Sequence, residues 1–246
     1  MSSLLAVFAH PDDESIACGG LLSRCAERGV EVSLLCVTRG EDAAPPGDDR
    51  AALGGKRSEE LAAAASVLGV GEIILLDYPD GELKWLPEER AAALERDIAD
   101  VTRRVGADVV VTFVEDGLYW HPDHIALHHR VTAAVRSLGP DAPSLYYVSM
   151  PEGAMRALVD AVGGGHVLGI EDPDAFGTLA PAPTLTIDVS GSAAKKLAAI
   201  QCHASQVAGG ALARLDAARA ARMLNVEQFR RGPFGHPGRT LLDELA

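Results

Sequence analysis

Residues 9–14 read AHPDDE and directly follow the apolar run LLAVF at residues 4–8. The apolar run predicts a buried strand, and the helical pattern that opens at Gly19 predicts a helix after the turn. A histidine and three acids would then lie at the carboxyl end of a strand, where open α/β sheets bind ligands. Crowded acids repel one another and are costly to desolvate, so a divalent cation would stabilise them. His10 with Asp13 is a donor pair suited to zinc, iron or manganese. The alternative is a polar turn in which an aspartate caps the helix.

Further apolar runs alternate with helical patterns along the 246 residues. They predict strands at 31–37, 72–76, 108–113, 145–150 and 185–189, and helices at 56–68, 87–105, 192–202 and 210–224. Strands separated by helices of this length indicate right-handed crossovers and a parallel sheet. The predicted fold class is α/β: a Rossmann-like, mostly parallel sheet flanked by helices, with a small C-terminal lobe. We expect one domain over 1–246, with a Rossmann-like core at 1–150 and the lobe at 151–246.

The charge balance limits the classes of partner. With 22 basic and 35 acidic residues the net charge is −13, which disfavours nucleic acid and anionic lipid as partners. No apolar run approaches the ~20 residues of a membrane span. The first apolar run is short and lacks a preceding basic region, so we expect a cytoplasmic protein. The four cysteines show no C-x-x-C spacing and are expected to be free thiols.

A second histidine-rich turn follows the strand predicted at 108–113. Residues 117–124 read GLYWHPDH and repeat the order of strand end, His-Pro-Asp and helix. Pro122 suits the first helical position, which makes His121 the expected N-cap and puts His124 one turn further on. Alone, this pattern is also typical of a solvated helix start. Two such turns, each after a parallel strand, indicate one metal site built from both.

Together the two turns resemble the PIG-L/LmbE family of metal-dependent de-N-acetylases. The resemblance extends over most of the chain, through TRGE at 38–41, RSEE at 57–60 with LG at 68–69, YPDG at 78–81 and HASQ at 203–206. These resemble the family's T-x-G-E, R-x-x-E…L-G, P-D-G and H-x-S-Q patterns. The two His-Pro-Asp turns are the specific part of the match, and the other patterns are weak alone.

The resemblance implies a catalytic metal site. His10, Asp13 and His124 would bind zinc and leave positions open for water and substrate. The same set resembles a facial triad, so Fe²⁺ is the alternative metal. Asp12 would be the general base, taking a proton from a water whose pKa the metal lowers towards ~7.

Other positions are assigned by the same resemblance. His121 would stabilise the oxyanion or protonate the leaving amine. Tyr119 matches a position whose phenol can reach the oxyanion, and its alternative is a packing aromatic. Arg57 and Asp80 match positions that hold the substrate's sugar or phosphate, and their alternatives are a surface ion pair and a plain turn aspartate.

The remaining polar residues of interest have structural alternatives. Glu14 is expected to fix a metal-binding histidine or to cap the helix, and His203 either approaches the site or is a core histidine. Four histidines carry no motif and are expected at the surface or in structural roles: His128, His129, His166 and His236.

The predicted function is a zinc-dependent amide hydrolase that removes the N-acetyl group from an N-acetylglucosamine-type amino sugar conjugate, a small molecule. The alternatives are an amidase cleaving a thiol–sugar (mycothiol-type) S-conjugate and a metal- or nucleotide-binding module without turnover. No pattern indicates an oligomeric state. The loop 41–55 and the segment 163–183 are expected to decide the substrate. Asp12 is not needed to hold the metal, and its presence argues against a module without turnover.

Overall fold

Continuous apolar runs make the strands of one central sheet, because a parallel strand is covered on both faces. The computed structural model describes residues 2–177, 182–235 and 241–245, so His236 lies outside the described residues. The strands are β1 (Ser3–Phe8), β2 (Glu31–Cys36), β3 (Glu72–Leu75), β4 (Val109–Phe113), β5 (Ser144–Ser149), β6 (Leu185–Asp188) and β7 (Val226–Arg231). Their order is β3-β2-β1-β4-β5-β7-β6, with β7 antiparallel to both of its neighbours. The predicted α/β class with a mostly parallel sheet is confirmed.

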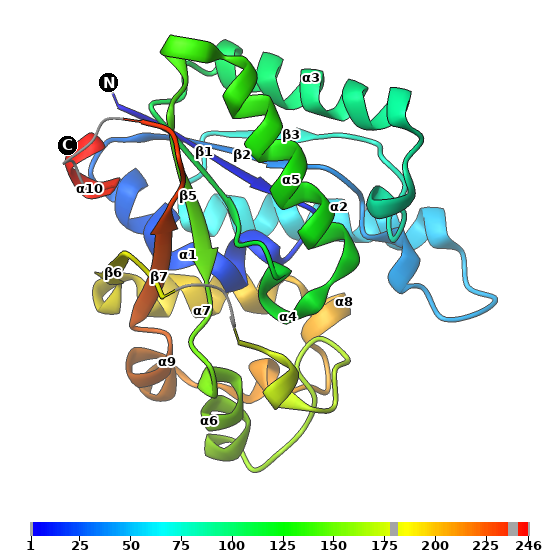
Figure 1. The fold of residues 1–246 in the computed structure, drawn as a ribbon. Helices are drawn as coiled ribbons and strands as arrows, with labels where there is room; N and C mark the ends of the chain where they lie inside the picture. The colour runs from blue at the N-terminus through cyan, green and yellow to red at the C-terminus, as the bar shows by residue number, and fades with distance from the viewer. Residues whose placement is uncertain (1, 178–181, 236–240, 246) are drawn as a thin grey trace.

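Helices cover both faces of this sheet (Figure 1). They are α1 (Asp13–Glu27), α2 (Arg50–Leu68), α3 (Glu88–Arg104), α4 (Gly117–Trp120), α5 (Pro122–Ser137), α6 (Ala154–Ala161), α7 (Ala193–Cys202), α8 (Ala204–Val207), α9 (Ala217–Met223) and α10 (Leu241–Glu244). Helices α1, α2 and α7 pack together on one face, and α3 packs on α5 on the other. None of the described helices is long and apolar enough to cross a membrane.

Strand β1 pairs with β2 on one side and with β4 on the other. The chain therefore winds away from β1 in both directions, and the carboxyl ends of β1 and β4 form a topological switch point. In open α/β sheets this is the place where ligands bind. The first His-Pro-Asp turn follows β1 and the second follows β4, so the topology brings both turns to the same point.

The helix after β1 begins earlier than predicted. It starts at Asp13, because the carbonyl of Asp12 accepts the N–H groups of Ser15 and Ile16 at 3.2 and 3.1 Å. The prediction that the helix begins at Gly19 is wrong. This position lies inside α1, next to a kink at Cys18, where φ is −142° and ψ is 23°.

The kink leaves two backbone N–H groups to be accepted from outside the helix, and an acid far along the chain accepts both. Those of Gly20 and Leu21 donate to the Glu227 carboxylate of β7, each at 2.8 Å. Glu227 also pairs with Lys196 of α7 at 2.6 Å, and both side chains are buried. A Cβ on Gly20 would lie 2.6 Å from Cγ2 of Val189, so only glycine fits this contact. Glu227 thus serves as the cap of the second half of α1.

Other boundaries also differ from the prediction. The helix expected at 210–224 is wrong: the chain forms a 3₁₀ turn at Leu212–Arg214 and then α9. Asp216 is the N-cap of α9, because its side chain accepts the Arg219 N–H at 2.7 Å. The chain therefore begins a new helix there and does not continue one from residue 210. The polar loop after β2 is shorter than expected, since Asp49 caps α2 by accepting the Ala52 N–H at 3.1 Å.

Candidate metal and active site

The two His-Pro-Asp turns meet at the switch point and bring three predicted metal ligands together. Nδ1 of His10 lies 3.1 Å from Nε2 of His124, and Asp13 oxygens lie 3.4 and 3.2 Å from these two nitrogens. All three side chains are buried. Ligand atoms about 2.1 Å from a tetrahedral metal are about 3.4 Å apart. The spacing of the three side chains therefore fits a single metal ion.

The outer nitrogens of the two histidines have partners that fix their protons. Nδ1 of His124 lies 3.1 Å from the Gly117 carbonyl oxygen, and Nε2 of His10 lies 3.0 Å from Oδ1 of Asp80. Both acceptors require an N–H, so in the neutral rings the two nitrogens that face each other carry lone pairs. Two lone pairs repel at this distance, so either a proton shared by the two rings, as in a hydrogen bond, or a cation must lie between them. The donor set therefore fits a divalent cation, with the outer partners orienting the rings.

Asp80 and Asp123 surround the outer side of His10. The second oxygen of Asp80 accepts the Asp42 N–H at 2.8 Å. Asp123 is fully buried, lies 3.5 Å from Nε2 of His10, and accepts the N–H groups of Gly81 and Leu83. The turn at 78–81 is thereby joined to the second His-Pro-Asp turn. No role was predicted for Asp123, although the repeat of His-Pro-Asp was a signal for one.

Asp12 lies beside the three ligands in a conformation that is unusual for its residue type. Its φ is 127°, a region that favours glycine. Its N–H donates to Oε2 of Glu14 at 3.1 Å, and its carboxylate accepts from Nη2 of Arg57 at 3.2 Å. Burial raises the pKa of Asp12 to about 6, although the Arg57 guanidinium acts in the opposite direction.

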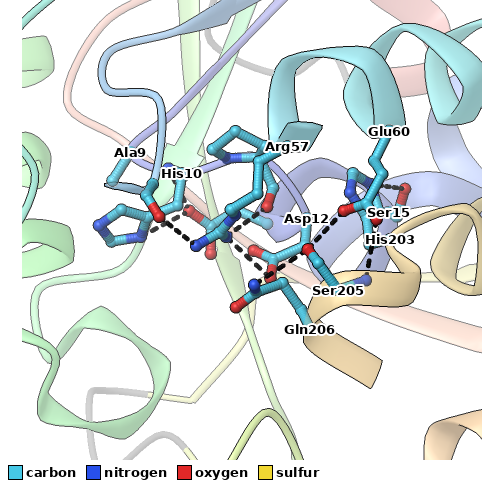
Figure 2. Close-up of polar contacts among 12 residues, drawn as sticks. Ala9, His10, Asp12, Ser15, Arg57, Glu60, His203, Ser205 and Gln206 are labelled. Carbon is cyan, nitrogen blue, oxygen red and sulfur yellow. Dashed lines mark hydrogen bonds and ion pairs between the residues drawn. The ribbon is translucent and has the colours of Figure 1, made fainter. Parts of the chain in front are cut away.

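Arg57 is buried and joins two turns, so it is not a surface ion pair (Figure 2). Besides Asp12 it donates to the carbonyl oxygens of Pro11 and Gly40, at 2.6 and 2.9 Å. Gly40 has a φ of +68°, and a Cβ there would lie 2.4 Å from Cζ of Arg57. The glycine of the TRGE segment is therefore required by the close approach of the guanidinium.

Glu14 and His203 form a buried pair behind Asp12. Oε1 of Glu14 lies 2.8 Å from Nε2 of His203 and accepts the hydroxyl of Ser15. Burial lowers the pKa of His203, but the charge and hydrogen bond of Glu14 raise it overall. The expectation that Glu14 holds a metal-binding histidine is wrong. The histidine that it contacts is His203, and its other oxygen accepts the backbone N–H of Asp12.

The rest of the HASQ segment is anchored on α2. Glu60 accepts both the N–H and the hydroxyl of Ser205, at 2.9 and 2.6 Å. Figure 2 shows this contact next to the Asp12–Arg57 pair, with the side chain of Gln206 beside them. The C-terminal part of the chain is thus joined to α1 through Glu14 and to α2 through Glu60, and both acids are buried.

His121 and Tyr119 supply hydrogen-bond donors to the site. His121 is the N-cap of α5, as predicted, and its Nδ1 accepts the Asp123 N–H at 3.3 Å. In the neutral ring Nε2 therefore carries the proton. Burial, with His124 and His10 nearby, lowers the pKa of His121 to about 4. Burial also raises the pKa of Tyr119, as do the charges of Asp13 and Asp12, so its phenol stays protonated.

A cleft of about 320 Å³ opens over these residues. Its lining comprises His10, Asp12, Asp42, Ala43, Arg57, Asp80, Gly81, Tyr119, His121, Leu168, Ile170 and Gln206. Both predicted substrate-binding residues, Arg57 and Asp80, line it, but much of their hydrogen-bonding capacity is used within the protein. Leu168 and Ile170 were not predicted, and they come from the segment 163–183 that carried no clear pattern.

Three other described histidines, His128, His129 and His166, do not line this cleft. His128 is buried and its Nδ1 lies 2.9 Å from the Phe113 carbonyl oxygen, whereas His129 is exposed. His166 orders its own loop, since its Nδ1 accepts the Gly169 N–H at 3.0 Å. These contacts agree with the structural and surface roles expected for them.

The chain is similar to known proteins in sequence and in structure. Residues 5–135 match the PIG-L family model, described as GlcNAc-PI de-N-acetylase. Two relatives named 1D-myo-inositol 2-acetamido-2-deoxy-alpha-D-glucopyranoside deacetylase are each 34% identical. The one from Kineococcus radiotolerans aligns with 83% of this chain and 68% of its own length. The one from Acidothermus cellulolyticus aligns with 84% of this chain and 80% of its own length.

Two solved structures share the fold. The N,N'-diacetylchitobiose deacetylase from Pyrococcus horikoshii has a TM-score of 0.66 at 23% identity, covering 94% of this chain and 84% of its own. The 4-carboxy-2-hydroxymuconate hydratase GalB from Pseudomonas putida has a TM-score of 0.69 at 23% identity, covering 98% and 100%. A deacetylase and a hydratase thus share one architecture, so the fold alone does not specify the reaction.

Proposed function

The chain belongs to the PIG-L family of de-N-acetylases, and from this membership we propose that it removes the N-acetyl group from an N-acetylglucosamine-type conjugate. The reaction is amide hydrolysis: a water oxygen bonds to the acetyl carbon, the C–N bond breaks, and acetate and a free amine leave. The observation that carries the proposal is the pair of histidine nitrogens that face each other at 3.1 Å, with Asp13 beside them and Asp12 next in the cleft.

His10, Asp13 and His124 would hold a divalent cation, zinc in our proposal and Fe²⁺ as the alternative. When bound, the cation acts as a Lewis acid that polarises the acetyl carbonyl and lowers the pKa of water towards ~7. Asp13 can use one oxygen for this task, because its Oδ2 already accepts the His10 N–H at 2.8 Å. The ligand set leaves positions open, as catalytic zinc sites do.

Asp12 is the proposed general base. It lines the cleft but is not needed as a ligand, and Arg57 and Glu14 hold its side chain and backbone. It would accept the proton of the attacking water and pass it to the leaving nitrogen, which general bases in hydrolases commonly do. A module that only bound metal would have no need of this residue.

His121 is proposed to stabilise the oxyanion. Because Nδ1 accepts a backbone N–H, the proton on Nε2 is available to the cleft. Tyr119 is a second donor, with its ring 5.6 Å from that of His121. Donors that are already in place stabilise developing negative charge without reorganising.

Arg57 and Asp80 are proposed to act mainly through their neighbours. Arg57 fixes the first His-Pro-Asp turn, and Asp80 orients His10. Direct contacts to the sugar would come only from the surfaces of these two side chains that line the cleft. The proposal therefore gives Arg57 and Asp80 only a smaller, direct part in binding the substrate.

The decisive experiment is a hydrolysis assay with zinc- and iron-loaded protein. The substrates are the inositol glycoside named for the relatives, free N-acetylglucosamine, a thiol–sugar S-conjugate and plain acetamide. Release of acetate and amine from N-acetylglucosaminides supports the proposal. Cleavage of the S-conjugate alone would make the protein an amidase of the second kind, and binding without cleavage would make it a module without turnover.

A further inference from the structure

The cleft has an apolar part that the proposed reaction does not use. Two branched aliphatic side chains, Leu168 and Ile170, line the same cleft as the charged catalytic groups. We call these two side chains the aliphatic wall. Both lie in the loop between α6 and β6, the yellow-green segment that Figure 1 shows near α4 and α8. Tyr119 of α4 and Gln206 of α8 line the cleft with them.

Leu168 is held in a conformation that leucine rarely adopts. Its φ is +51° and that of Gly169 is +78°. Val167 and Ile170 exchange two backbone hydrogen bonds, at 3.0 and 2.9 Å, around these residues. Positive φ at both central positions is the type I′ turn, in which the first position usually holds asparagine, aspartate or glycine. A leucine there is strained, and strained residues concentrate at ligand sites.

The turn is anchored through the residues that precede it, which explains how the strain is maintained. Val167 is fully buried. The carbonyl of His166 accepts the Ala211 N–H at 2.9 Å, and Arg214 donates to the Gly164 carbonyl. The aliphatic wall is therefore a pre-formed surface of the cleft.

From these observations we propose that the aliphatic wall selects substrates whose aglycone has an apolar face, such as an aryl or alkyl group. This inference rests on the proposed function. The acetamide must reach the metal ligands, and the sugar hydroxyls need polar partners, which Asp42, Gln206 and Arg57 offer. Leucine and isoleucine offer none, so a polyol placed against them would lose hydrogen bonds to water without replacement. An apolar aglycone would instead remove both surfaces from water.

The test compares phenyl N-acetylglucosaminide with the inositol glycoside as substrates of zinc-loaded protein. We expect wild type to have the higher kcat/KM on the phenyl glycoside. In Leu168→Asn, which suits the turn, the ratio of the two kcat/KM values should fall about tenfold, since apolar contacts in a pocket contribute on this scale. The loss should appear mainly in KM for the phenyl glycoside, and Tm should not fall.

Ile73→Thr is the matched control. Ile73 is 37% exposed on β3 and does not line the cleft, so the ratio should stay at the wild-type value. A wild type that prefers the inositol glycoside, or an equal loss on both substrates in Leu168→Asn, would overturn the inference.

Calorimetric binding separates this inference from the proposed function. The same two glycosides are titrated into zinc-loaded Asp12→Asn and into Asp12→Asn with Leu168→Asn. Tighter binding of the phenyl glycoside, lost in the double variant, supports the aliphatic wall even where wild type releases no acetate. Hydrolysis by wild type with equal binding of the two glycosides would support the proposed function and would refute the inference about the aliphatic wall.

Discussion

Oε1 of Glu14 lies 2.8 Å from Nε2 of His203, although 189 residues separate the two in the chain. Both side chains are fully buried. The other oxygen of Glu14 accepts the N–H of Asp12, whose φ of 127° needs such support. The late histidine therefore acts on the proposed base through one intervening carboxylate.

We expect His203→Asn to lower kcat by roughly 10–10²-fold, because a small displacement of a catalytic group has effects of this size. KM and bound metal should change little, since His203 contacts no proposed ligand. Steady-state kinetics and metal analysis check this, with Tm showing that the fold persists. The exposed His129→Asn is the control. Unchanged kcat in folded His203→Asn would show that the pair is only a packing contact.

Variants of Asp12 and of its neighbour Asp13 should affect catalysis and metal binding separately. Asp12→Asn should retain the metal and lose ~10²–10⁴-fold in kcat, the usual contribution of a general base. Asp13→Ala and His124→Ala should lose metal affinity. Metal content and kcat are measured together for each variant. Normal turnover by Asp12→Asn would show that Asp12 is not the general base.

Asp80 is expected to affect metal affinity through His10. In Asp80→Asn the metal dissociation constant should rise ~10–100-fold, the usual effect of losing a carboxylate that orients a metal-binding histidine. Competition with a chromogenic chelator measures it. Asp42→Asn, also in the cleft, is the control and should bind metal normally. An increase in KM for sugars at unchanged metal affinity would instead assign Asp80 to substrate binding.

Chelation should abolish hydrolysis and leave the fold largely intact, because the ligands lie at strand ends and not within the sheet. Activity, far-UV circular dichroism and metal content are followed during dialysis against a chelator. Addition of zinc or Fe²⁺ should restore activity, and the better metal identifies the cofactor. Full activity in protein shown to contain no metal would exclude the site assignment.

His128 predicts a pH-dependent stability unrelated to the metal. Burial lowers its pKa in the folded protein, so the unfolded chain binds more protons as the pH falls below its ordinary value of about 6.5. Stability contributed by neutral His128 is present above that pH and is lost below it. Between pH 7.5 and 5.5, the Tm of wild type should fall more than that of His128→Gln. Parallel Tm profiles would contradict this.

Sequence patterns predicted the parallel strands well, because each is a continuous apolar run. Strand β7 was not predicted, since its sequence VEQFRR mixes charges with apolar residues. That pattern fits its place near the sheet edge, where Glu227 points inward to α1 and arginines are partly exposed. An inward carboxylate cannot be distinguished from a solvated one until its partners are known.

Most residues of the candidate site were predictable from the sequence, but several contacts among them and the aliphatic wall were not. His10, Asp13 and His124 share one repeated motif, and the structure brings them within ligand distance of each other. The contact between Asp80 and His10 depends on how separate crossovers align. Leu168 occupies a turn position that usually takes a polar residue or glycine, so no residue preference pointed to it.

The capping of α1 by Glu227 has a consequence for the order in which the protein is completed. The N–H of Leu21 and its carboxylate acceptor are 206 residues apart. A ribosome therefore releases the first helix long before it synthesises the strand that caps it. The second half of α1, which follows the predicted metal-binding turn, therefore obtains its cap only after residue 227 has emerged.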